Sequence, residues 1–375
     1  MRLLLVAFLY CLPVTVGAQT FEESVLWPLG IDSADGIKEH FVYGLIQADN
    51  GDVLAFSEGR IQLGDDSPHH IVLKRSRNKG KDWLPSQIIV RSSKGESFAN
   101  PTPVKDKKTG KLFLFYARNL NNDSSRVCYI ISNDQGATWS APVEVTGLFA
   151  ADPFQRPFHL PGPGHGITLD NGRMLVQVWH RYAVKQPVAD RKYGVSVIYS
   201  DDNGTTWKSG GYLPGVDAFT ANESRLVSLG GTRILLDARL GGMAAFADRA
   251  QSVSTDGGST WSDPVPGTIT RFPPVDAGLT AIKHKGKLYL LQTRPLGPGR
   301  NDLAVSYSAD EAKSWSPPKL LFKGPANYSD IIVLKDRSFL VLYGRGKPRY
   351  AAALRFDWNW LISDIKTDQK KKKQQ

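Results

Sequence analysis

A short turn pattern occurs five times in this chain, at intervals of about 54 to 68 residues. The octets are SRNKGKDW, SNDQGATW, SDDNGTTW, STDGGSTW and SADEAKSW, beginning at residues 76, 132, 200, 254 and 308. Four have Asp at the third position, which can accept backbone N–H groups across the turn, and four have Gly at the fifth, which permits a positive φ. A repeat near 50 residues is typical of propellers and other arrays, so this repeat determines the expected architecture.

Apolar runs lie between the octets and are typical of strands. Six of them, each following a turn signal, span 52–60, 111–118, 173–181, 232–239, 287–294 and 338–346. No window of 11–18 residues has sustained helical periodicity. One run per repeat predicts an all-β, six-bladed β-propeller over residues 19–365, in which a C-terminal strand near 352–358 pairs with the N-terminal segment.

The two ends of the chain carry separate signals. Residues 1–18 have the pattern of a secretory signal peptide, with Arg2, an apolar run and Val16-Gly17-Ala18 as the cleavage site. No later segment has 18 consecutive apolar residues, so no membrane span is predicted. We expect a protein that is secreted or lies in a secretory-pathway lumen. Residues 366–375 are predicted to be a basic, disordered tail, with weak anchoring to anionic surfaces as the alternative.

Charge and cysteine content narrow the classes of partner. The net charge is +11, and four of these charges lie in Lys370–Lys373, which leaves about +7 for the rest of the chain. The excess suits an anionic ligand, whereas no nucleic-acid-binding motif is present. Removal of the signal peptide, with Cys11, leaves Cys128 alone, so no intrachain disulfide is expected. Cys128 is predicted to be a half-buried strand residue.

Motifs outside the octets follow one another in a fixed order: NPTPV (100–104), GPGHGI (162–167), NES (222–224), LLDAR (235–239) and NYSD (327–330). In these motifs and in the octets, from about residue 40 to 361, the chain resembles the sialidase (neuraminidase) family of Asp-box propellers. The resemblance implies an exo-α-sialidase-like glycoside hydrolase that removes terminal sialic acid, or a related nonulosonic acid, from glycoconjugates with retention of configuration. It implies neither a cofactor nor a metal.

The substrate's own chemistry limits which nucleophile can act. A sialic acid carries a carboxylate on its anomeric carbon, which would repel a carboxylate nucleophile, and sialidases use Tyr instead. A Tyr of ordinary pKa needs a neighbouring base to take its proton. By motif match, Tyr328 in NYSD is the implied nucleophile and Glu223 in NES the implied base. About 105 residues separate them, so only a closed propeller would bring them together.

Three arginines match substrate-binding positions of the family. Guanidinium groups bind carboxylates through bidentate, charge-assisted contacts. Arg239, at the end of LLDAR, and Arg300, in GRNDLAVSYS, resemble two members of the family's carboxylate-binding triad, and Arg60 resembles a further substrate-facing arginine. Because all three end patterns expected for inner strands, we expect them to share one anionic pocket. The resemblance also suggests His165, in GPGHGI, as a substrate-pocket residue.

The loop after residue 60 should carry the general acid/base. Asp65 and Asp66 are the candidates, and the distance back from the strand IVLKRS favours Asp65. The neighbouring His69 and His70 could suggest a metal site. A vicinal pair on a strand points to opposite faces, however, so none is predicted.

The chain departs from the family at the first triad arginine. Val42, in FVYG, stands at that position, and Gly344 replaces the Glu that would hold the arginine. Joint loss is physically coherent, because a Glu without its arginine would be a buried unpaired charge. Lys38, His40 or Arg345 could supply the missing cation. Otherwise two arginines grip the carboxylate more weakly, or the substrate differs from ordinary sialosides.

Two rival functions fit parts of the pattern. A propeller that kept the sugar pocket and lost turnover would be a non-catalytic, lectin-like sialoside-binding module. A propeller glycosidase or lyase could instead act on another acidic sugar, which the basic excess would also suit. The presence of both Tyr328 and Glu223 favours hydrolysis, because that pair has little purpose in a lectin.

Overall fold

The computed structural model describes residues 20–28, 35–65, 67–120, 122–183, 185–215, 219–241, 249–269, 273–297, 299–346 and 350–363. Within these ranges the chain is all-β, as the sequence predicts. Its helical segments are short: the 3-10 turns η2 (Thr146–Phe149) and η3 (Val188–Arg191), and one α-helical stretch over 358–363. No helix in the described ranges has the length and apolar character needed to cross a bilayer. The predicted signal peptide and basic tail lie outside the described residues.

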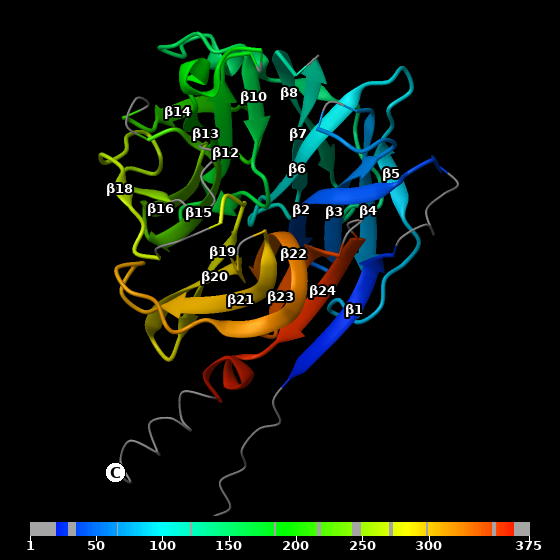
Figure 1. Cartoon of the computed structure of the whole chain (residues 1–375), viewed down its shortest axis with the longest axis vertical. Helices are drawn as coiled ribbons and strands as arrows, with labels where there is room; N and C mark the ends of the chain where they lie inside the picture. The colour runs from blue at the N-terminus through cyan, green and yellow to red at the C-terminus, as the bar shows by residue number, and fades with distance from the viewer. Residues whose placement is uncertain are drawn as a thin grey trace, which may run out of the picture.

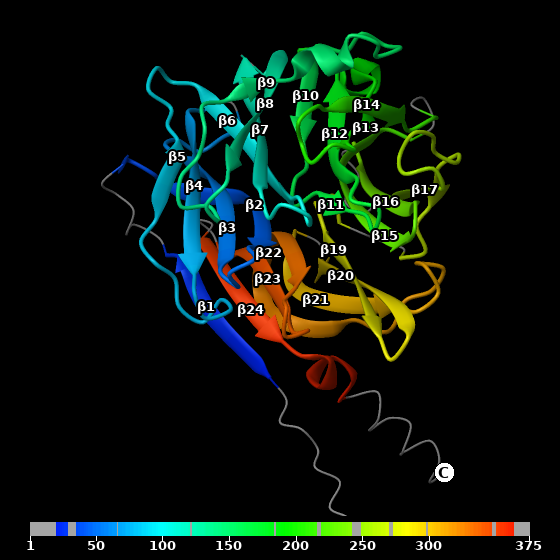
Figure 2. The same cartoon turned by 180° about the vertical axis from the view of Figure 1, so that it is seen from behind.

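The strands form four sheets, which Figures 1 and 2 show arranged about a common centre. One sheet contains, in spatial order, β1 (Phe21–Trp27), β24 (Tyr350–Phe356), β23 (Phe339–Arg345), β22 (Lys319–Val333), β21 (Asn301–Ser308), β20 (Lys287–Gly297) and β19 (Gly278–His284). Another contains β15 (Ala221–Gly230), β16 (Arg233–Leu240), β17 (Ala250–Ser254) and β18 (Val265–Pro266).

The other two sheets each have one strand off the main path. The first contains β10 (Phe158–Pro161), β12 (Met174–Arg181), β13 (Gly194–Ser200) and β14 (Lys208–Tyr212), with β11 (Ile167–Thr168) paired to β12. The second contains β2 (Glu39–Gln47), β3 (Val53–Arg60), β4 (His69–Ser76), β6 (Ser97–Lys105), β7 (Leu112–Leu120), β8 (Ser124–Ser132) and β9 (Val143–Glu144), with β5 (Gln87–Val90) paired to β4.

Two features of the pairing divide these sheets further. Strand β22 pairs with β21 through its first half and with β23 through its second half, from Ala326 onward. Strands β4 and β6 meet only through one parallel bridge, His69 to Ser97. Apart from the pairing of the two chain ends, the other strand pairings are antiparallel between strands that follow closely in the chain, which is the pattern of repeated meanders.

The termini meet as the sequence predicts. Strand β1 pairs antiparallel with β24, with Phe21 opposite Phe356 and Trp27 opposite Ala351. Trp27 is fully buried, and its indole N–H donates to the Ser86 hydroxyl at 3.1 Å. The N-terminal strand β1 is therefore the outer strand of the sheet that contains the C-terminal strands β23 and β24.

The octets form the predicted turns, after β4, β8, β13, β17 and β21. In the second octet the Ser132 hydroxyl donates to Asp134 (2.8 Å), while the backbone N–H groups of Gly136 and Thr138 donate to Ser132 and Asp134 (2.7 and 2.9 Å). In the fifth octet Ala312 replaces Gly yet still has a φ of 68°. The turn geometry, rather than the residue type, thus fixes the conformation there.

All six predicted apolar runs are strands: β3, β7, β12, β16, β20 and β23. They are not the innermost strands, however. The inner strands are β2, β6, β15, β19 and β22, with β10 and β11 in the remaining sheet, and each of the six runs lies one place further out. The expectation that the candidate arginines end inner strands is therefore wrong. Arg60 and Arg239 end second strands, and Arg300 lies in the turn between β20 and β21.

Candidate active site

Strands β2, β6, β10, β15 and β22 contribute side chains to one cavity of about 500 Å³ near the centre of the molecule. Five of its lining side chains are arginines and three are carboxylates, an excess of two positive charges among the described residues. The charged lining residues are Glu58, Arg60, Asp65, Arg181, Arg191, Glu223, Arg239 and Arg300. Such a balance favours an anionic ligand.

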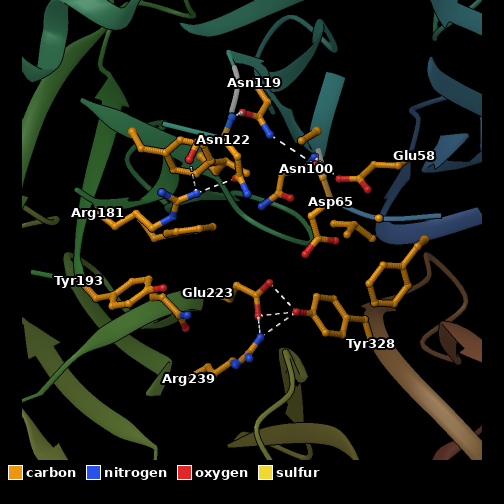
Figure 3. Close-up of a pocket in the computed structure, with 18 of the residues that line it drawn as sticks. Glu58, Asp65, Asn100, Asn119, Asn122, Arg181, Tyr193, Glu223, Arg239 and Tyr328 are labelled. Carbon is orange, nitrogen blue, oxygen red and sulfur yellow. Dashed lines mark hydrogen bonds and ion pairs between the residues drawn. The ribbon is translucent and has the colours of Figure 1, made fainter. Parts of the chain in front are cut away.

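Tyr328 and Glu223 meet at the base of this cavity (Figure 3). The Tyr328 hydroxyl lies 2.6 and 2.7 Å from the two carboxylate oxygens of Glu223. Strand β22 brings the phenol and β15 the carboxylate, and both side chains are largely buried. The contact is within the reach expected of a nucleophile and its base.

Arg239 joins this pair from the end of β16. Its Nη1 donates to Glu223 Oε2 at 2.5 Å and to the Tyr328 oxygen at 2.8 Å. Burial and the nearby Glu223 charge raise the pKa of Tyr328, which Arg239 and Arg300 oppose. Burial would lower the pKa of Arg239, but Tyr328 and Glu223 outweigh it and raise that pKa. At neutral pH the phenol is therefore protonated and beside an acceptor, and the guanidinium is charged.

Arg300 reaches the same site from a turn. Its guanidinium lies 5.4 Å from the centroid of the Tyr328 ring, and its Nη2 donates to the Pro274 carbonyl at 2.8 Å. Arg300 has a φ of 61°, an uncommon conformation for a residue other than Gly. Arg300 thus reaches the cavity from a turn and not from a strand.

Arg60 and Asp65 form a second charged group on the cavity wall. Arg60 Nη1 lies 3.0 Å from Asp65 Oδ1, and its Nη2 donates to Glu58 Oε2 at 2.7 Å. Burial alone would lower the pKa of Arg60, but the charges of Glu58 and Asp65 outweigh burial and raise this pKa above its usual value. The Asp65 side chain is 81% exposed and so can reach a ligand at the mouth. Asp66, the alternative candidate, lies outside the described residues.

The two vicinal histidines have structural partners. His69 Nε2 lies 3.0 Å from the Ser67 hydroxyl and 2.9 Å from the Gly64 carbonyl, so it anchors the loop that carries Asp65. His70 Nδ1 accepts the Ser92 N–H at 2.9 Å. They face different surroundings, as expected for neighbours on a strand.

His165 is not in this cavity. Its Nδ1 lies 2.9 Å from the buried carboxylate of Asp330, and the residue lines a separate cavity of about 330 Å³. Asp330 also accepts bonds from Arg225 Nη1 and the Leu45 N–H, both at 2.8 Å. The suggestion that His165 binds substrate beside Tyr328 is therefore wrong, because its imidazole contacts the buried Asp330 and lines the other cavity.

The glycine at position 344, one half of the departure from the family, has a packing explanation. Val42 lines the cavity at a β-bulge, with a φ of 54° that is unusual for a β-branched residue. The next residue, Tyr43, turns away, and its hydroxyl donates to the His40 carbonyl at 2.9 Å. A Cβ atom at Gly344 would lie only 2.6 Å from that hydroxyl. Tyr43 thus fills the space that a side chain at position 344 would need, so Gly344 is sterically linked to the residue that follows Val42.

None of the three candidate replacement cations lines the cavity. Lys38 is exposed, and His40 stacks on Trp27 with ring centroids 4.8 Å apart. Arg345 pairs with Glu23 and lies over the Phe322 ring. Among the described residues, the guanidinium groups beside Tyr328 are those of Arg239 and Arg300.

Sequence reasoning missed the wall opposite Tyr328. Arg181, Arg191 and Tyr193 line it, together with Asn119 and Asn122. Arg181 ends the run 173–181 in the same way that Arg60 and Arg239 end theirs, and this signal was available in the sequence.

Comparison with known proteins agrees with this picture. Residues 51–341 match the family model of the BNR repeat-like domain. Mouse Sialidase-3 is 24% identical over 346 residues, covering 76% of this chain and 82% of its own. The sialidase of Micromonospora viridifaciens is 28% identical over 365 residues, covering 89% of this chain and 54% of its own. The solved structure of the Hadza microbial sialidase Hz136 superposes with a TM-score of 0.76 at 22% identity, covering 87% of this chain and 67% of that one.

The all-β fold, the octets and the matched range define a BNR-repeat protein of the propeller type. Within that class, the chain belongs to the sialidase family.

Cys128 is a half-buried residue of β8, as predicted, and burial raises the pKa of its thiol to about 11.

Proposed function

We propose that this protein is a retaining exo-α-sialidase, which removes terminal sialic acid, or a related nonulosonic acid, from glycoconjugates. Membership of the sialidase family supports the class of reaction. The observation that carries the proposal is the contact of Tyr328 with Glu223 and Arg239, three residues from distant parts of the chain in one cavity.

A six-bladed propeller is the architecture that best supports this site. The pairings group the strands as β2–β5, β6–β9, β10–β14, β15–β18, β19–β21 with the first half of β22, and the second half of β22 with β23, β24 and β1. This division supports six meanders. Each innermost strand then delivers its residues to one end of a central channel.

In the proposed mechanism, the Tyr328 oxygen attacks the anomeric carbon while Glu223 accepts the phenolic proton. Asp65, or Asp66, protonates the glycosidic oxygen as its bond to the anomeric carbon breaks. The resulting glycosyl–tyrosine intermediate is hydrolysed when the same carboxylate takes a proton from water. The anomeric carbon then gains the water oxygen, and Tyr328 leaves with its proton returned by Glu223.

Arg239 and Arg300 would hold the substrate carboxylate. Arg239 already contacts the nucleophile and the base, so a carboxylate bound to it lies beside Tyr328. The loss of one charged donor relative to a three-arginine site lowers affinity by about 10- to 150-fold. We therefore expect weak binding of simple sialosides.

Replacement of Tyr328 by Phe tests the proposal against the lectin alternative. The variant should lose hydrolysis of a fluorogenic sialoside and retain binding of the intact sugar, measured by calorimetry. Tyr343→Phe is a matched control, because Tyr343 also donates to a Glu, Glu23, at 2.9 Å but lies away from the cavity. A wild-type protein that binds sialosides without cleaving them would establish the lectin instead.

Two further measurements complete the assignment. NMR of the first product should show the α-anomer, because double displacement retains configuration. A panel of fluorogenic sialosides and uronides tests the second rival, a propeller glycosidase or lyase for another acidic sugar. Uronide cleavage without sialoside cleavage would establish that rival. The secretory localisation remains part of the proposal, and cell fractionation with N-terminal sequencing tests it.

A further inference from the structure

Arg181 is a buried cation on the cavity wall that faces Tyr328 across the site (Figure 3). The residue is 4% exposed, and no carboxylate in the described part of the chain lies within ion-pair distance of it. A buried charge without a direct ion pair is unfavourable, because burial removes water and no carboxylate takes its place in contact with the charge.

Of the other five buried arginines among the described residues, Arg294 donates to the Ser306 hydroxyl and the rest are compensated by carboxylates. Four of them each pair with a carboxylate: Arg60 with Glu58, Arg156 with Asp152, Arg225 with Asp276, and Arg249 with Asp237. Arg181, which also lines the cavity, differs from these four because its hydrogen-bond partners, the Tyr182 carbonyl and Asn122, are neutral.

The neutral contacts hold the guanidinium in place without using all of its donors. Nη1 donates to the Tyr182 carbonyl at 2.9 Å, and Nη2 donates to the carbonyl and side-chain oxygens of Asn122 at 3.0 and 2.7 Å. The central carbon of the guanidinium lies 3.6 Å from the centroid of the Phe158 ring, which packs beneath it. A guanidinium has five N–H groups, so two have no acceptor among the described residues.

The surroundings add positive charge and a further donor. Arg191 lines the same wall. Burial, together with the charge of Arg191, lowers the pKa of Arg181 to about 10 against the opposing charges of Tyr193, Asp123 and Asp65, which leaves Arg181 protonated at neutral pH. The Trp179 indole N–H is buried without a partner among the described residues. Two cations and an unused donor on one wall are suited to an oxyanion.

We propose that this wall is a second anion subsite, in which Arg181 binds an acidic group of the glycan other than the carboxylate at the anomeric carbon. The inference rests on the proposed function and narrows its substrate class to glycans that carry two acidic groups. The second group is a carboxylate of an adjoining nonulosonic acid or a sulfate ester, and both offer oxygens for bidentate contact with a guanidinium.

Three substrates test this subsite: a neutral-aglycone sialoside, an α2,8-linked disialoside, and a sialoside with a sulfate ester on its exocyclic chain. The wild-type protein should cleave one of the doubly acidic substrates with a kcat/KM about 10- to 150-fold above that of the simple sialoside. Which of the two is preferred identifies the source of the anion. Equal kcat/KM for all three would refute the subsite.

Two variants separate anion binding from a structural role of Arg181. In Arg181→Gln, the ratio of kcat/KM for the preferred doubly acidic substrate to kcat/KM for the simple sialoside should fall to near unity. Asn122→Asp keeps Arg181 but places a carboxylate at the 2.7 Å contact, so it should remove the preference as well. An equal loss of kcat/KM on all three substrates in both variants would mean that Arg181 only supports the Asn122 loop.

Matched controls isolate these effects. Ser124→Ala removes the Asn122-Asp123-Ser124 glycosylation signal, as Asn122→Asp does, and should keep the preference. Arg126→Gln removes an exposed arginine on the neighbouring strand and should keep it as well.

Inorganic sulfate tests the subsite independently of the sugar. Its binding, measured by calorimetry, should weaken at least tenfold in Arg181→Gln but not in Arg126→Gln. If the wild type cleaves no sialoside yet shows this sulfate difference, the sialidase assignment fails and the subsite stands. If sialosides are cleaved and sulfate binding is unchanged by Arg181→Gln, the subsite is refuted and the sialidase assignment stands.

Discussion

Replacement of Glu223 by Gln should separate catalysis from binding at this site. The carboxylate accepts the Tyr328 hydroxyl at 2.6 and 2.7 Å and Arg239 Nη1 at 2.5 Å. Gln keeps the shape and one acceptor oxygen but cannot take the proton. Because burial holds the pKa of Tyr328 above its usual value, the phenol would remain un-ionised at neutral pH. A general base contributes about 10²- to 10⁴-fold, so kcat should fall by that factor, or about 2.7–5.5 kcal/mol.

The Michaelis constant should move differently from kcat. Loss of the Glu223 charge frees Arg239 from its ion pair, so the substrate carboxylate no longer has to compete with Glu223 for that guanidinium. We therefore expect an unchanged or lower KM with a sialoside whose leaving group is activated. Glu311→Gln is a control, because Glu311 pairs with Arg233 at 2.7 Å on the surface. A Glu223→Gln variant with kcat within tenfold of the wild type would refute the role of Glu223 as base.

Three other predictions concern the acid/base, the packing beside Val42 and the response to pH. Asp65→Ala should lower kcat/KM about 10²- to 10⁴-fold for natural sialosides but much less for 4-nitrophenyl sialosides, whose leaving group needs no proton; equal losses would exclude the acid role. Gly344→Ala should lower the free energy of unfolding by about 1–3 kcal/mol in urea titrations. Adding Tyr43→Phe to this variant should restore part of the lost stability, because it removes the hydroxyl that the new methyl group meets. Additive effects of the two substitutions would contradict the steric link. Burial lowers the pKa of His159 to about 4, so the wild type should lose roughly 3 kcal/mol of stability as pH falls from about 6.5 to 4, and His159→Phe should show a flatter dependence.

The strand-end arginines show where sequence reasoning stops. Each of the six apolar runs contains an Arg at or near its end: Arg60, Arg118, Arg181, Arg239, Arg294 and Arg345. Three of these line the cavity. Of the others, Arg118 is half exposed near Glu96, Arg294 donates to the Ser306 hydroxyl, and Arg345 pairs with Glu23. Local sequence is alike in all six, so only the position of each strand end in the fold distinguishes a ligand-binding arginine from a structural one.

His165 fails as a prediction for the same reason. A Gly-rich loop with one His is compatible with either end of the central channel. The deciding contact is to Asp330, which lies 165 residues away and is itself fixed by Arg225 from another strand.

The sequence by itself determined the features that depend on neighbouring residues. These are the octet turns, whose hydrogen bonds close within five residues, and the strands between them. It also singled out Tyr328 and Glu223 by motif. Tertiary structure alone decided that the two are in contact, that Tyr43 occupies the space beside Gly344, and that Arg181 faces the site without a carboxylate. Those facts depend on which segments lie side by side after the sheets assemble, and no local pattern specifies that.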